Sequence, residues 1–326
     1  MPESRESFDD TRAIAPVNMT SQFLLHSTAQ FVPSAEADPR PDGTGLFAPS
    51  GAETQHFAVI DAARVFGFAE RMKGYDLAAV CLYDLSNDPA LGEVAPWLVP
   101  LVPGHPLAID LVADTAEAPN HWELLRAEAA IFIETDQSLE QMRAHLRRYT
   151  QLPDEAGVRY FFRFYDPFTL PALMQSLSPP ELAGFMQNCA AISCVTPRYD
   201  GAWLAHRFAV DPSLRAMAPA PVVIDKYKRD RLQHVAFMRK AWEISHSVDH
   251  TNEIAAQFEQ VAIPLMFCAY SDPERLLELF ALHRQLPPEG KASLIHWAQS
   301  GKYSPRHLGL AIARQYGLTY PDGATQ

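Results

Sequence analysis

The sequence predicts an α/β protein of the α+β kind, with an N-terminal lobe built on a mixed β-sheet flanked by helices and a mainly helical C-terminal lobe. Short apolar runs rich in β-branched and aromatic residues dominate the first two thirds of the chain, and helical periodicity dominates beyond Lys226. The chain has 326 residues, of which 48% are hydrophobic and 20% charged. This composition is typical of globular proteins with a buried core, and the length favours about two domains.

Changes in composition divide the chain into three parts. Residues 1–54 are expected to form a loosely ordered leader, because prolines recur there among Ser, Thr, Asp and Gly. The apolar piece at residues 23–25 is expected to form a helical turn or to dock on the folded body. Residues 55–200 are predicted to form the α/β lobe and residues 201–326 the helical lobe, with no internal repeat of fixed period.

Buried strands are predicted at three apolar runs bounded by turn residues: residues 57–66, 77–85 and 129–135. The run at residues 158–165 and the stretches 192–196 and 203–210 also fit strands. The segment 95–102 contains Pro96 and Pro100, which lack the amide hydrogen that a central strand donates. We therefore expect this segment at a sheet edge or in an extended connection.

Helix starts are marked by an N-capping residue that is followed by proline or by a capping box. They lie at Ser138 with Gln141, at Asp166–Pro167, at Ser178–Pro179 and at Asp272–Pro273. Apolar residues recur at helical spacing after these starts, which predicts amphipathic helices that pack on a core.

Charge and cysteine usage exclude several classes of protein. The net charge of −12 and the pI near 5.4 disfavour a general nucleic-acid binder, because a negative field repels the phosphate backbone. No apolar run approaches the roughly 20 residues that span a bilayer. The first residues are acidic where a signal peptide is basic. The four cysteines form no CxxC pair and are expected to be reduced and mostly buried. A cytoplasmic protein without a membrane partner is predicted.

Several blocks of the chain, in the same order and with the same spacing, resemble a known bacterial family. They are FAVIDAAR at 57–64, CLYDLSNDPALGEVAPWLVPL at 81–101, His121–Trp122, SLEQMRAHLRRY at 138–149 and FFRFYDPFTLPALMQSLSPPELAGFM at 161–186. This pattern resembles the N-terminal domain of the Tec or Tap adaptors, the effector chaperones of type VI secretion, first classed as a domain of unknown function. The helical lobe carries the likeness only weakly.

The resemblance implies an adaptor that performs no chemistry and needs no cofactor. Such a protein binds a cognate toxin, keeps it competent for loading and helps to attach it to the spike-tip protein of the secretion apparatus. The partners implied are therefore the toxin and the spike-tip protein.

Two groups of residues are candidates for partner binding. Arg163, Tyr165 and Asp166 either line a groove that receives the partner, or serve the fold, with Asp166 capping a helix and Arg163 pairing with a core carboxylate. Arg143, Arg147 and Arg148 either dock an acidic toxin surface or form a solvated helix face. In the C-terminal lobe, large apolar side chains form the core, and some are expected to remain exposed for a partner. These are Trp242, Phe258, Met266, Phe267, Tyr270, Phe280 and Trp297.

An alternative function is that of a metal-dependent hydrolase. His246 and His250 are spaced to share one helix face and bind a metal, with Asp249 and Glu253 beside them, although the Glu of an HExxH motif is missing. Cysteine nucleophiles at Cys189 or Cys194 are a weaker option, since a lone cysteine is more often a small buried hydrophobe. A structural subunit of an oligomer is a third interpretation.

Overall fold

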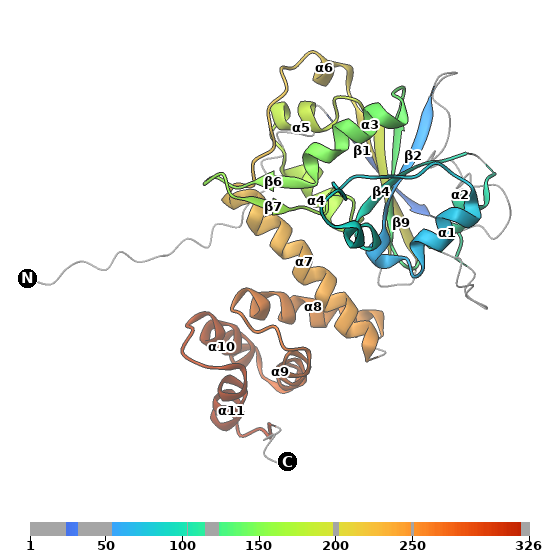
Figure 1. Ribbon diagram of the computed structural model, residues 1–326. Helices are drawn as coiled ribbons and strands as arrows, with labels where there is room; N and C mark the ends of the chain where they lie inside the picture. The colour runs from blue at the N-terminus through green and yellow to red at the C-terminus, as the bar shows by residue number, and fades with distance from the viewer. Residues whose placement is uncertain are drawn as a thin grey trace, which may run out of the picture.

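The computed structural model describes residues 54–102, 104–114, 124–197, 202–248 and 251–320, together with the backbone of residues 24–31. Figure 1 shows an α/β lobe and a helical lobe that are joined by one long helix. The predicted α/β class is confirmed.

The central sheet has the strand order β1-β9-β8-β5-β2-β4-β3 within the described residues. Its strands are β1 (Leu24–Phe31), β2 (Gln55–Asp61), β3 (Val80–Cys81), β4 (Pro96–Pro100), β5 (Ala130–Thr135), β8 (Ala191–Pro197) and β9 (Trp203–Val210). Every pairing of these strands is antiparallel, so the sheet is not mixed. Parallel neighbours need a long crossover connection, whereas β8 and β9 are consecutive strands that pair antiparallel.

The sheet draws on residues outside the 55–200 segment. Strand β9 lies beyond residue 200 and pairs with β8 along its whole length, and β1 from the leader pairs with the other edge of β9. A truncation after residue 200 would therefore remove one strand from the interior of the sheet and leave β1 without its neighbour.

The predicted strand at residues 129–135 is confirmed as β5, which is buried throughout. The stretches 192–196 and 203–210 are also confirmed as strands, β8 and β9, whereas the runs at residues 57–66, 77–85 and 158–165 form shorter strands than expected. The run from residue 57 leaves the sheet at Asp61, whose carboxylate accepts a hydrogen bond from the Ala63 amide (3.2 Å) and starts a 3₁₀ turn. The run at 158–165 forms only β7 (Arg159–Phe161), which pairs with β6 (Gln151–Pro153) in a separate ribbon.

The proline-containing segment forms β4, which lies inside the sheet between β2 and β3. The Leu101 amide donates to the His56 carbonyl of β2, and the Ala95 carbonyl accepts from Ala62, just after β2, while the Pro96 carbonyl accepts from the amide of Leu82, beside β3. Since bonding groups alternate along a strand, the nitrogens of Pro96 and Pro100 face β3. Strand β3 is only two residues long, so the missing amide hydrogens leave few acceptors unpaired.

Helices cover both faces of the sheet (Figure 1). One face packs against α3 (Leu139–Leu146), α4 (Thr169–Ser176) and α5 (Pro179–Phe185), and the other against α1 (Phe68–Tyr75) and α2 (Pro106–Asp110). Phe57 and Val59 of β2 belong to the first core, and Ala58 and Ile60 to the second. This is the alternation that a strand buried on both faces requires.

Three of the four predicted helix starts are confirmed, whereas the helix predicted to start at Asp166–Pro167 begins at Thr169, with Phe168 in the N-cap position. Ser138 forms its capping box with Gln141 and begins α3, and Ser178 forms one with Glu181 and begins α5. Asp272 caps the helix that follows it. These caps satisfy amide groups of the first turn that have no partner within the helix.

The helical lobe is confirmed beyond residue 226. It contains α7 (Lys226–Ser247), α8 (Asn252–Phe267), α9 (Pro273–Gln285), α10 (Pro288–Gln299) and α11 (Pro305–Tyr316). Helix α7 contacts α4 of the first lobe, and Ala241 and Ile244 near its end belong to the core of the bundle. Within the described residues, no helix combines the length and the apolar character needed to cross a membrane.

We predict that acidification destabilises the α/β lobe through His145, which is buried under α5. The His145 Nε2 atom lies 2.9 Å from the Phe185 carbonyl oxygen, and Nδ1 lies 2.6 Å from the Arg148 guanidinium, which suits a neutral ring. Burial lowers the pKa of His145 from 6.5 to about 4. As the pH falls below 6.5, His145 therefore takes up a proton in the unfolded chain but not in the folded protein. The folded state loses stability from pH 6.5 down to the folded pKa of about 4.

Between pH 6.5 and pH 5, His145 is expected to lower the free energy of unfolding by about 2 kcal/mol. Urea unfolding at several pH values, compared with the same series on His145→Gln, measures it. An unchanged pH dependence in the variant would contradict the assignment.

Candidate functional site

Arg163, Tyr165 and Asp166 lie in the turn that connects β7 to α4. The Arg163 guanidinium forms an ion pair with the buried Asp61. The Asp166 carboxylate accepts hydrogen bonds from the amides of Phe168 (2.9 Å) and Thr169 (3.0 Å), at the start of α4. Arg163 therefore pairs with a core carboxylate and Asp166 bonds to amides at a helix start, which are the structural roles that the sequence allowed for them. Their role in partner binding stays a prediction.

Tyr165 is almost completely buried, with 1% of its surface exposed. Its hydroxyl lies 3.1 Å from that of Tyr83, and the Arg163 guanidinium lies 5.8 Å from the centre of its ring. Tyr165 therefore offers almost no surface of its own to a partner, and it supports Tyr83 and Arg163 from beneath.

A buried cluster of charges lies beneath this turn. Arg64 lies 3.4 Å from Asp166, 3.6 Å from Glu128 and 3.9 Å from Asp61, and Arg239 of α7 forms an ion pair with Glu128. Burial raises the pKa of Glu128, while the positive charges of Arg239 and Arg64 oppose that rise. The cluster joins β2, the segment before β5, the turn before α4 and α7, so it holds α7 on the first lobe.

Arg239 is also held by an aromatic contact. Its guanidinium lies 4.5 Å from the centre of the Phe168 ring, within the range of cation–π attraction. Asp61 and Arg64 belong to the block FAVIDAAR at 57–64, but nothing in the sequence linked them to Glu128 or Arg239, since the cluster exists only after folding.

The structure gathers three predicted arginines around the loop after β3. Arg143 Nε donates to the Cys81 carbonyl oxygen (2.9 Å), and Arg147 lies 3.9 Å from the Asp84 carboxylate. Arg163 lies over the ring of Tyr165, whose hydroxyl contacts that of Tyr83 in this loop. Phe161 packs against Tyr83 with ring centres 5.2 Å apart. We call Arg143, Arg147, Arg163, Tyr83 and Phe161 the arginine-aromatic surface.

This surface is open to solvent and locally basic. Phe161 is 62% exposed, and the side chains of Arg163 and Arg147 are 47% and 37% exposed. Asp84 balances one of these charges, and Asp61 is buried beneath Arg163. A basic patch on a chain with a net charge of −12 favours an acidic partner.

Arg148 does not join the arginine-aromatic surface. It bonds to His145 instead and lines a small pocket near Gly184 and Pro219. The predicted group of three arginines is therefore divided: Arg143 lies on α3, and Arg147 and Arg148 follow in a 3₁₀ turn, where Arg148 contacts His145 and not the loop after β3.

A second surface feature is an open groove of about 1120 Å³ between the two lobes. It is lined mainly by apolar side chains of α4, β9, α7 and the end of α8: Phe168, Pro171, Leu204, Tyr227, Met238, Trp242 and Phe267. Phe267 is 46% exposed and Tyr227 40%. The sequence predicted that part of the aromatic surplus stays exposed, and Phe267 does so, whereas Phe258, Met266, Tyr270 and Phe280 are buried.

Three of the four cysteines are buried, as expected, and no two of them are joined by a disulfide. Burial raises the pKa of the Cys189 thiol to about 12 and also raises that of Cys194. Neither thiol is present as the thiolate that nucleophilic attack requires near neutral pH.

The histidine pair of the hydrolase alternative cannot be assembled from the described residues. The His246 ring packs against Trp242 in a tilted arrangement (4.2 Å between ring centres), and its Nδ1 lies 2.8 Å from the Trp242 carbonyl oxygen. Asp249 and His250 lie outside the described residues, as do His121 and Trp122. Among the described side chains, no group of three His, Cys, Asp or Glu is placed to hold a metal ion.

Comparisons with known proteins found a match for one part of this chain. No curated protein and no solved structure matches it. One family model matches the segment that runs from β2 to α5 and includes Arg143, Arg147, Arg163 and Asp166, less than half of the chain. Over residues 56–184, the α/β lobe matches the family described as "Domain of unknown function (DUF4123)".

Proposed function

We propose that this protein is a cytoplasmic, non-enzymatic adaptor of type VI secretion that binds a cognate toxin and helps to load it onto the spike-tip protein. The observation that carries the proposal is the match at residues 56–184. It coincides with the blocks between residues 57 and 186 that resemble effector chaperones of this secretion system.

The arginine-aromatic surface supplies the toxin-binding site in this proposal. Its buried side is fixed by the Arg163–Asp61 ion pair and by the Tyr165–Tyr83 contact, so the exposed side chains are held in place before a partner arrives. Preorganised aromatic and arginine side chains are the residues that most often dominate the binding energy of an interface. An acidic, partly apolar patch on the toxin is the complementary surface.

Co-purification tests the function. The tagged full-length chain is expressed together with the product of the neighbouring candidate toxin gene and with the spike-tip protein. A stable complex at a salt concentration of about 0.15 M is expected, because close ion pairs survive screening at that ionic strength. Recovery of the chain alone at several salt concentrations would overturn the adaptor proposal.

A further inference from the structure

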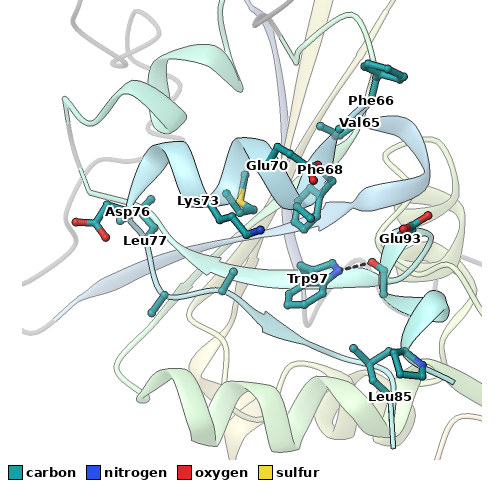
Figure 2. A pocket seen from close by; sticks show the side chains of 17 residues that line it. Val65, Phe66, Phe68, Glu70, Lys73, Asp76, Leu77, Leu85, Glu93 and Trp97 are labelled. Carbon is teal, nitrogen blue, oxygen red and sulfur yellow. Dashed lines mark hydrogen bonds between the residues drawn. The ribbon is translucent and has the colours of Figure 1, made fainter. Parts of the chain in front are cut away.

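An open pocket of about 1140 Å³ lies between α1 and the 3₁₀ helix η2 (Pro89–Glu93), beside the edge of the sheet at β3 (Figure 2). Phe68, Met72 and Trp97 form part of its apolar lining. The rings of Phe68 and Trp97 have their centres 5.6 Å apart, and the Trp97 Nε1 atom donates to the Gly92 carbonyl oxygen (2.8 Å). The Trp97 ring is thereby held in a fixed position, with one side in the pocket.

The rim of this pocket carries excess negative charge. Glu70, Asp76 and Glu93 line it, against a single cation, Lys73. Figure 2 shows Glu70, Lys73 and Asp76 on the side of α1 and Glu93 on the opposite side of the Trp97 ring. A ligand that enters between them meets carboxylates on both sides.

Phe66 is the most exposed large hydrophobic residue among those described, with 94% of its surface in contact with solvent. It stands at the mouth of the pocket in a turn that is held by Gly67, whose φ of +66° suits glycine, and by a hydrogen bond from Arg71 Nε to the Phe66 carbonyl oxygen (2.9 Å). An aromatic side chain fixed in this way contributes nothing to the core and is typical of interface anchors.

We propose that this pocket docks an extended segment of a second partner protein, in which a large apolar side chain stands between basic residues. The apolar side chain packs on Phe68 and Trp97, and the flanking Lys or Arg side chains pair with the rim carboxylates. Phe66 covers the docked segment from the side. The charge of the rim selects the basic flanks, and the apolar floor selects the central residue.

The pocket and the arginine-aromatic surface share one loop. Tyr83 belongs to the arginine-aromatic surface, Asp84 forms an ion pair with Arg147 of that surface, and the next residue, Leu85, lines the pocket together with Gly92. The two surfaces have opposite charge, so one attracts an acidic partner and the other a basic one. This inference goes beyond the proposed function, because docking of a basic segment requires neither a toxin nor a secretion apparatus.

Fluorescence anisotropy with the full-length chain tests the proposal. The probe is a fluorescein-labelled peptide in which two lysines stand on each side of a tryptophan. One comparison peptide replaces the tryptophan with alanine, and another replaces the lysines with glutamates. Binding of the Lys-Trp peptide is expected, with about tenfold weaker binding of the alanine peptide and none of the glutamate peptide.

Matched variants separate the pocket from the general negative field of the chain. Glu70→Lys with Glu93→Lys is expected to weaken binding of the Lys-Trp peptide by about tenfold or more. The control, Glu274→Lys with Glu289→Lys, makes the same change in net charge on the helical lobe and is expected to leave binding nearly unchanged. Phe66→Ser is expected to weaken binding about tenfold, and Val248→Ser, at another exposed apolar position, is the control.

Equal losses in the two charge variants, or no binding of the Lys-Trp peptide, would overturn the proposal. A dimer in solution that Phe66→Ser dissociates would assign the pocket to a second copy of the chain and would also overturn it. A toxin complex that forms normally while the peptide fails to bind would reject the pocket alone and leave the adaptor function in place.

Discussion

Replacement of Arg239 with alanine is expected to lower the free energy of unfolding by about 3 kcal/mol, because it removes a partner from a buried ion pair. The Glu128 side chain is 3% exposed and that of Arg239 is 14% exposed. Burial already raises the pKa of Glu128, so the loss of Arg239 leaves its charge with Arg64 alone at 3.6 Å. The same change removes the cation over Phe168 and loosens α7 from the first lobe.

Urea unfolding, followed by circular dichroism, measures this effect. The matched control is Arg275→Ala, which breaks the Arg275–Glu278 pair on the helical lobe, where both side chains are about a quarter exposed. A partly exposed pair of this kind is expected to contribute much less than a buried one, because solvent screens it. Similar losses in the two variants would show that the Glu128 cluster does not stabilise the junction of the lobes.

Arg147→Glu combined with Phe161→Ser is expected to weaken toxin binding by about 100-fold, which corresponds to about 2.7 kcal/mol. Arg147→Glu places a negative charge opposite an acidic partner and beside Asp84. Phe161→Ser removes an apolar side chain that is 62% exposed and free to contact the toxin. Both side chains are largely outside the core, so the fold should be retained. Arg163 is left in place because its ion pair with Asp61 belongs to the buried network.

Isothermal titration of the purified chain with its toxin measures the change. Arg284→Glu with Val248→Ser alters charge and apolar surface by the same kinds of substitution on the helical lobe and should leave affinity within about twofold, as expected for residues outside an interface. Retained affinity in the Arg147 and Phe161 variant would place the toxin elsewhere, with the groove between the lobes as the next surface to test.

The local signals in the sequence were reliable where the physical cause is local. Ser138, Ser178 and Asp272 each start a helix because a side chain satisfies amide groups two or three residues away. The strand at residues 129–135 formed because a run of apolar residues is stable when both faces of a sheet are covered.

Strand neighbours did not follow from such signals, and neither did the lengths of the strands predicted at residues 57–66, 77–85 and 158–165. Segment 95–102 became the interior strand β4 because its prolines face a two-residue partner, and that partner is set by the whole sheet. Tyr165 and Arg163 lie two residues apart in one motif, yet the first is buried and the second half exposed, since a turn and not a strand carries them.

The sequence by itself determined the α/β class, the helical second lobe, the helix starts and the resemblance of residues 57–186 to effector chaperones. Only the tertiary structure decided which charged residues meet. Asp61, Glu128, Asp166 and Arg239 come together from segments far apart in the chain, and so do Arg147, Tyr83 and Phe161. The physical reason is the distance along the chain over which the interactions act. Helix caps and periodic apolar patterns involve residues a few positions apart, whereas these ion pairs and surfaces form only when distant segments pack together.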